Sequence, residues 1–198
     1  MEGQEYRTSD TSQLINILKL SEEKKKELCD NLPFYDSRVT FASEIFSHKY
    51  NIVVLSVVDD YIRGLYQSKD TPDLFVGYAG YFDQEEWLRK FNDYQLFYLL
   101  DNFNFVGKEP IDVFESNLRQ LADRLSESLF IVINGPDIDV SEYIGRDRIN
   151  RNIEMNRVVD RVIMDYANMR LLDMREVVRK KSDVLKDNRH FNRNIYCN

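Results

Sequence analysis

One uninterrupted apolar segment constrains the fold of this 198-residue chain more than any other feature. Residues 52–58 read Ile-Val-Val-Leu-Ser-Val-Val, a β-branched run without the polar alternation of a strand that faces water on one side. Such a run is typical of a strand covered on both faces, as in a parallel sheet. It ends at Asp59 and Asp60, so a pair of carboxylates follows the predicted strand directly.

Two further strands and the helices between them follow the same plan. An apolar stripe over residues 114–125 predicts an amphipathic helix, and Pro110 is suited to its start. Residues 129–133 form a second apolar strand, a helix with its apolar face over residues 155–166 follows, and residues 170–173 form a short third strand. Parallel neighbours need crossovers of a dozen or more residues. We therefore expect an α/β fold, a three-layer parallel sheet with helices on both faces.

The remaining segments are predicted to be less regular. Residues 1–11 are polar and expected to be frayed, whereas residues 12–30 and 39–47 are candidates for helices. Residues 61–107 form a loop-rich insertion with many aromatic residues, which predicts either a satellite core beneath a long connection or an aromatic ligand groove. With 43% hydrophobic residues and only 7 Gly and 4 Pro, a single domain over residues 1–198 is expected.

Charge and hydropathy argue against nucleic acid as a partner and against a membrane span. The chain has 27 Lys and Arg against 34 Asp and Glu, a formal net charge of −7. This argues against nucleic acid as a partner, because that affinity depends on cations that displace phosphate counterions. No apolar run approaches the roughly 20 residues that cross a bilayer, and residues 1–5 lack the layout of a signal peptide. A cytoplasmic protein without a membrane span is expected, of unspecified oligomeric state.

Motifs for cofactors are missing from the sequence. Cys29 and Cys197 form neither a CxxC unit nor a disulfide framework, and the two histidines, His48 and His190, do not cluster with them. No dinucleotide fingerprint and no P-loop occurs. The carboxylates at 59–60 would suit magnesium in a receiver-like domain, but helix capping explains them equally well. The sequence therefore predicts no cofactor and no metal site.

In an open parallel sheet, ligands bind beyond the carboxyl ends of the strands. The functional site is therefore expected near residues 56–60, 134–139 and 173–175. Farther along, Asp187 and His190 form an Asp-x-x-His unit in a loop after the last strand. One loop can then present an imidazole and the carboxylate that fixes its tautomer and stabilises the imidazolium. His190 is the candidate general base and acid, and Asp187 is the candidate orienting carboxylate.

The sequence around this unit resembles a known family. The terminal motif continues as His-Phe-Asn-Arg over residues 190–193, and the strand Lys-Tyr-Asn-Ile-Val-Val-Leu-Ser over residues 49–56 precedes the carboxylate pair. In these motifs the segment 35–196 resembles the SGNH/GDSL hydrolases, especially the group associated with bacterial surface polysaccharides. The resemblance implies an SGNH-like, flavodoxin-like topology. It also implies an ester hydrolase or O-acyltransferase that acts on an acylated carbohydrate through a serine nucleophile and an acyl-enzyme.

Two parts of the family pattern are missing. Family members begin with a strand that ends in Gly-Asp-Ser, and no such strand precedes residue 12, so the domain is expected to be incomplete at its N-terminus. Ser37 echoes the motif but lies too close to the carboxylates at 59–60, which replace an asparagine that would donate to an oxyanion. If the chain has no nucleophile, turnover of p-nitrophenyl acetate is expected to be negligible. The alternative is a non-catalytic α/β module that binds a glycan or a protein partner through residues 61–107.

Overall fold

The chain folds into two compact units. Unit 1 comprises residues 1–49 and 63–109, and unit 2 comprises residues 50–62 and 110–198. The computed structural model describes residues 10–33, 35, 43–47, 50–62, 64–78, 89, 91–140, 146–185, 191, 192 and 195. Each unit has its own sheet, parallel in unit 2 and antiparallel in unit 1.

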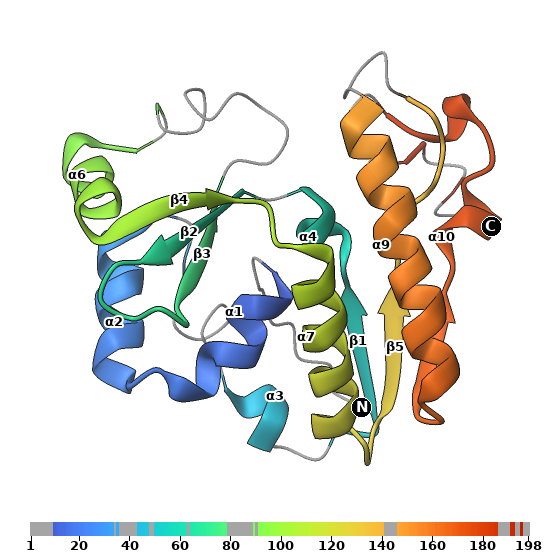
Figure 1. Ribbon diagram of the computed structural model, residues 1–198, viewed down its shortest axis with the longest axis horizontal. Helices are drawn as coiled ribbons and strands as arrows, with labels where there is room; N and C mark the ends of the chain where they lie inside the picture. Colours follow the sequence, from blue (N-terminus) through green and yellow to red (C-terminus); the bar gives the residue numbers. More distant parts are fainter. Residues whose placement is uncertain are drawn as a thin grey trace. The chain divides into compact units, whose positions relative to one another are not determined.

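Unit 2 contains a parallel sheet, as the apolar runs predicted, and its strand order is β1-β5-β6. The strands β1 (Ile52–Ser56), β5 (Leu129–Ile133) and β6 (Met169–Leu172) are joined in register along their whole lengths. Two helices, α7 (Ile111–Arg124) and α9 (Arg146–Asp165), supply the crossovers that parallel strands require. These helices lie next to each other beside the sheet and contact each other (Figure 1).

The predicted stripe on α7 is confirmed as the inner face of that helix. Phe114, Leu118 and Leu121 are completely buried, because a spacing of three or four residues places them on one side of the helix. Their counterparts on the sheet and on α9 are also buried: Phe130, Val132, Met155, Val158, Val159, Val162 and Met169. The α/β class predicted from the sequence therefore rests on a continuous apolar layer.

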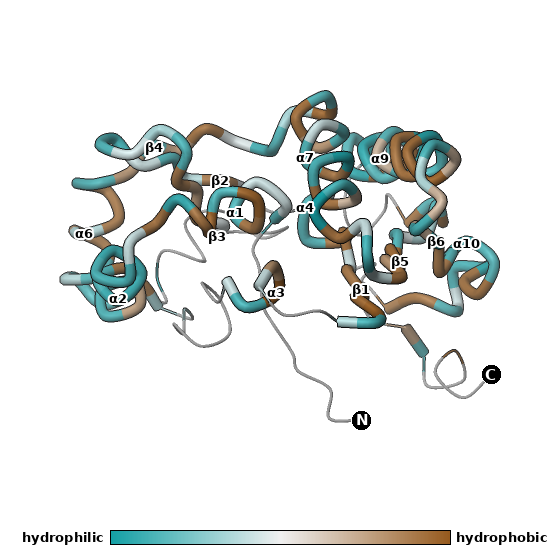
Figure 2. The backbone as a smooth tube through the Cα atoms, turned by 90° about the horizontal axis from the view of Figure 1, so that it is seen from below, coloured by the Kyte–Doolittle hydropathy of each residue, from teal (hydrophilic) through white to brown (hydrophobic). Residues whose placement is uncertain are grey.

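The two faces of this sheet differ in burial. Successive side chains of a strand point to opposite faces, and Val53 is buried whereas Ile52 and Val54 are 53% and 56% exposed. Leu129 and Leu172 are also exposed. The prediction that β1 is covered on both faces therefore fails among the described residues, because α7 and α9 lie on the same side of the three strands (Figure 2).

Unit 1 contains an antiparallel sheet in the order β3-β2-β4, inside the segment predicted to be rich in loops. Its strands are β2 (Gly64–Ser68), β3 (Phe75–Tyr78) and β4 (Phe103–Gly107). The prediction of an irregular insertion is wrong for these residues. The strands have only four or five residues each and contain Gly, Ser and Asn, so no apolar alternation is long enough to reveal them.

Two longer helices and an apolar core also belong to unit 1. The helix α6 (Asp93–Asn102) begins with a capping box between Asn92 and Gln95, and α2 (Glu22–Asn31) contacts it. The core comprises Ile17, Leu28, Leu32, Tyr66, Leu74, Val76, Phe91, Leu99 and Phe103. Several aromatic residues of the insertion therefore form a core, the first of the two alternatives predicted for them.

The single helix predicted over residues 12–30 is divided in three. α1 (Thr11–Asn16) and the 3-10 turn η1 (Ile17–Lys19) end before Ser21, whose hydroxyl accepts a hydrogen bond from the backbone N–H of Lys24 and starts α2 as a new helix. The short elements are α3 (Glu44–Ser47), α4 (Val58–Ile62), α10 (Met174–Val177) and the 3-10 turn η2 (Lys181–Asp183). Among the described residues, no helix combines the length and hydropathy that a membrane crossing requires.

Candidate active site at the carboxyl ends of the parallel strands

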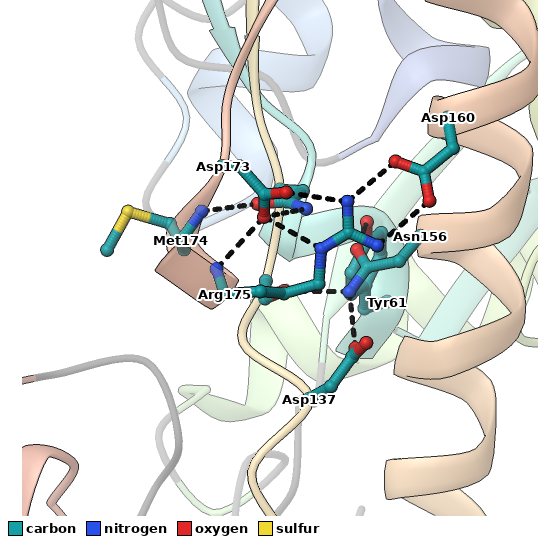
Figure 3. Close-up of polar contacts among 9 residues, drawn as sticks. Tyr61, Asp137, Asn156, Asp160, Asp173, Met174 and Arg175 are labelled. Carbon is teal, nitrogen blue, oxygen red and sulfur yellow. Dashed lines mark hydrogen bonds and ion pairs between the residues drawn. The ribbon is translucent and has the colours of Figure 1, made fainter. Parts of the chain in front are cut away.

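The loops that follow β5 and β6 are joined by one buried amide. Asn134 comes directly after β5 and is completely buried. Its Nδ2 donates to Oδ1 of Asp173, the first residue after β6, over 3.0 Å, and its Oδ1 accepts from the backbone N–H of Met174 over 2.7 Å. The segments after β5 and β6, residues 134–139 and 173–175, therefore meet at one edge of the sheet (Figure 3).

Asp173 also belongs to an ion-pair network centred on Arg175. The guanidinium donates to both oxygens of Asp173 over 2.7 Å and to both oxygens of Asp160 on α9 over 2.6 and 2.9 Å (Figure 3). Burial raises the pKa of Asp173, but hydrogen bonds from Arg175 and Asn134 outweigh it, and the pKa lies below its ordinary value. This network holds α9 against the end of β6.

A second buried amide, Asn156 of α9, orients the loop after β5. Its Nδ2 donates to the backbone oxygen of Gly135 over 2.8 Å and to Oδ1 of Asp137 over 2.5 Å, and its Oδ1 accepts from the Tyr61 hydroxyl over 2.5 Å. Tyr61 is completely buried, and burial raises its pKa well above the ordinary value. The phenol therefore remains a neutral donor and fixes the orientation of the Asn156 amide.

Asp137 differs from the other carboxylates at the strand ends. It is partly exposed, and Asn156 is the hydrogen-bond donor that the described residues provide to it. Burial raises its pKa, the hydrogen bond from Asn156 and the charge of Arg175 oppose the rise, and the charges of Asp173 and Asp160 add to it. The result is a carboxyl group that binds a proton more readily than an ordinary aspartate. This property suits a general acid or base.

From the sequence, no functional role was assigned to three residues of this site: Tyr61, Asn156 and Asp160. A signal for two of them was present. Arg148, Asn152, Asn156 and Asp160 recur every four residues, so they share one side of α9. Arg148, Asn152 and Asn156 are all buried, so this polar stripe faces the interior of unit 2. Buried polar side chains in a row indicate a partner network that hydrophobic periodicity alone does not show.

The residues proposed from the sequence have different outcomes. Asp187, His190 and Ser37 lie outside the described residues. Asp60 lies in α4 with only 3% of its surface exposed, and the Arg151 guanidinium donates to its backbone oxygen over 3.1 Å. Over the part of the chain that the structure describes, no three His, Cys, Asp or Glu side chains are grouped as metal ligands would be.

The fold and the site define a mixed α/β protein with a polar network at the carboxyl ends of a parallel sheet. Comparison of the chain with protein-family models, with curated proteins and with solved structures gives no match. The function is therefore inferred from the site and from the motifs of the sequence.

Gly135 should not tolerate a larger side chain. A Cβ atom at this position would lie 3.0 Å from Cε2 and 3.2 Å from Cδ2 of Tyr61, whose ring meets Phe114 edge-on. We expect Gly135→Ala to lower the free energy of unfolding by about 1–3 kcal/mol in urea denaturation, as overpacking does. In a Tyr61→Leu background the cost should shrink. An equal cost in both backgrounds would contradict the steric explanation.

The buried Tyr61 hydroxyl should contribute more to the free energy of unfolding than an exposed tyrosine hydroxyl that also donates to an asparagine. Tyr61→Phe leaves the buried Oδ1 of Asn156 without its donor, and we expect a loss of about 1–3 kcal/mol in the free energy of unfolding. Tyr94→Phe is the matched control, because Tyr94 donates to Asn31 but is 65% exposed. Its expected loss is about 0.5 kcal/mol or less. Equal losses would show that Asn156 does not depend on Tyr61.

Proposed function

We propose that this protein is an ester hydrolase or O-acyltransferase that acts on an acylated carbohydrate at the carboxyl ends of β5 and β6. The observation that supports the proposal most is Asp137, a partly exposed carboxyl with a raised pKa, held by Asn156 beside the ion pairs of Arg175. Acyl transfer needs a group that takes a proton from the attacking hydroxyl and returns it to the leaving group.

The charge of the strand ends favours a neutral substrate. Asp137, Asp160 and Asp173 contribute three carboxylates, and the guanidinium of Arg175 is already hydrogen-bonded to two of them. An anionic group such as a phosphate would meet a net negative charge and no cation of this network that is free to pair with it. A neutral acyl ester of a sugar meets no such repulsion.

The resemblance to SGNH/GDSL hydrolases supplies the remaining chemistry of the proposal. In that scheme a serine hydroxyl attacks the acyl carbonyl, His190 takes its proton, and Asp187 orients the imidazole. The acyl-enzyme is then resolved by water or by a sugar hydroxyl. Asp137 is the second group able to accept a proton, which leaves two candidates for the base.

The pH dependence of acetate release distinguishes the two candidates. We propose to measure release from O-acetylated xylo-oligosaccharides between about pH 4 and about pH 9. A carboxylate base gives an acidic limb with its midpoint above the ordinary 3.8 of Asp137, and its activity is lost in Asp137→Asn. A midpoint near that of an imidazole, lost together with activity in His190→Ala, assigns the base to His190.

Substrate binding is tested separately from turnover. The acetylated oligosaccharide should shift the side-chain amide signals of Asn134 and Asn156 in an NMR titration, and the deacetylated oligosaccharide should shift them less. This readout needs no nucleophile, so it tests the location of the site even where turnover is slow. Absence of both acetate release and signal shifts would contradict the proposal.

A second candidate function is binding of a glycan or a protein partner by unit 1. The observation that favours it is an apolar groove of 440 Å³ along α6, within the aromatic segment 61–107. Calorimetric titration with a panel of oligosaccharides tests its glycan form, and a flat response to all of them would remove that form.

A further inference from the structure

The helix α6 is apolar on the side that faces solvent. Tyr94, Phe97 and Leu100 are 65%, 68% and 51% exposed, and a spacing of three residues makes them neighbours along one side of the helix. Leu99, on the opposite side, is completely buried in the core of unit 1. A helix with apolar residues all round is normally covered on every side. The exposed side of α6 therefore has the character of a contact surface.

A groove follows this exposed side. Its described wall consists of Asp93, Leu96, Phe97, Leu100 and Asp101. The middle is apolar and each end has a carboxylate, and the two carboxylates are eight residues apart, about 12 Å along the helix. Asp101 lies near the C-terminal end of α6, where the helix dipole disfavours an anion. The ammonium group of Lys69 donates to the backbone oxygens of Leu100 and Asp101 at this end.

We propose that this groove docks a cationic amphipathic helix of a partner protein. Its apolar side would cover Phe97 and Leu100, and its Lys or Arg side chains would meet Asp93 and Asp101. This inference rests on the second candidate function and names the partner. It is independent of the proposed catalysis, because every residue that carries it belongs to unit 1.

The two carboxylates distinguish this partner from other occupants. If a second copy of the chain docked through α6, an antiparallel pair would place Asp93 against Asp101, and a parallel pair would place each aspartate against itself. Like charges meet in both orientations, which disfavours self-association. Along the described wall of the groove, a glycan would find hydrogen-bond partners only at the two ends, because Leu96, Phe97 and Leu100 between them have none to offer.

Fluorescence anisotropy with a designed peptide tests the proposal. The probe is a labelled helical peptide of about 18 residues with leucines along one side and two lysines eight residues apart. We expect Asp93→Lys combined with Asp101→Lys to weaken its binding at least tenfold, or about 1.4 kcal/mol, and a peptide with glutamates for lysines to recover the loss. Glu154→Lys, an exposed charge change on α9, is the matched control and should leave binding unchanged.

The apolar contact has its own pair of variants. Phe97→Ser should weaken peptide binding at least tenfold, because large side chains at the centre of an interface dominate affinity. Met164→Ser, at an 80% exposed position of α9, should not change it. Circular dichroism confirms that each variant is folded before affinities are compared.

Three outcomes would overturn the inference. The first is no binding of the lysine peptide, or equal binding of the glutamate peptide, by the unaltered protein. The second is self-association in sedimentation that Phe97→Ser abolishes, which would identify a second copy as the occupant. The third is oligosaccharide binding lost in Phe97→Ser without peptide binding, which would retain a binding function for unit 1 but refute a protein partner.

Discussion

Asp137→Asn is expected to lower the rate of acyl-ester hydrolysis by about 10²- to 10⁴-fold, the usual contribution of a positioned acid or base. An amide cannot bind or release a proton in this range, but its oxygen can still accept the hydrogen bond from Asn156. The geometry of the strand ends should therefore persist while proton transfer is lost. The measurement is acetate release at neutral pH, with Glu154→Gln on α9 as the control.

The same substitution is expected to stabilise the protein at neutral pH. Burial raises the pKa of Asp137 in the folded state above its ordinary value of 3.8. Between the two pKa values the folded protein binds more protons than the unfolded chain, so stability falls as the pH rises through this window. At neutral pH the carboxylate is ionised, and the folded state bears the full free-energy cost of its partial burial. Asparagine has no charge and removes this cost. At a pH below 3.8 the carboxyl is protonated in both states, and the advantage of Asp137→Asn should disappear.

Urea denaturation at neutral and at acidic pH checks this prediction. A variant that is inactive and less stable than the unaltered protein at neutral pH would show that the Asp137 carboxylate is structural. A variant that is more stable and equally active would show that Asp137 takes no part in the reaction. Higher stability combined with lost activity is the expected combination for a functional group held in an unfavourable environment.

Arg175→Met is expected to lower the free energy of unfolding by about 2 kcal/mol, less than for a fully buried pair because the side chain is 26% exposed. Without the guanidinium, Asp160 and Asp173 lose the cation that they share. The matched control is Arg119→Met, which removes a guanidinium shared by two carboxylates on the surface of α7 and α9, at an expected cost of about 1 kcal/mol or less.

The pH dependence of Arg175→Met follows from the lowered pKa of Asp173. A carboxyl with a depressed pKa stabilises the fold above its unfolded pKa, and the contribution is lost as the pH falls through the folded value. The difference between Arg175→Met and the unaltered protein should therefore shrink below about pH 4. Arg175 also lowers the pKa of Asp137, so its loss should move the acidic limb of activity to higher pH, whereas Arg119→Met should not.

The parallel sheet could be predicted because its signals are local. The run at residues 129–133 is a strand, the stripe of Phe114, Leu118 and Leu121 is the inner face of α7, and the strands pair in parallel as predicted. Each of these follows from side-chain periodicity or from the topology of parallel strands, which a single sequence displays.

The partners within the site could not be predicted in the same way. Tyr61 and Asn156 are 95 residues apart. The polar stripe of α9 marks Asn156 as a residue with a buried partner, but nothing in the sequence identifies Tyr61 as that partner. The sequence also could not show that one side of β1 and one side of α6 are exposed, because periodicity shows which residues are apolar but not what covers them. The antiparallel sheet of unit 1 could not be predicted for a related reason. Its strands are short, and they pair with partners on the far side of turns and helices.

An NMR titration of the Asp137 carboxyl carbon, assigned by its loss in Asp137→Asn, tests most directly whether the strand ends hold a proton-accepting group. We predict a midpoint above 3.8 in the unaltered protein and a higher one in Arg175→Met. A midpoint at or below 3.8 would contradict the assignment of Asp137 as the acid or base of the site.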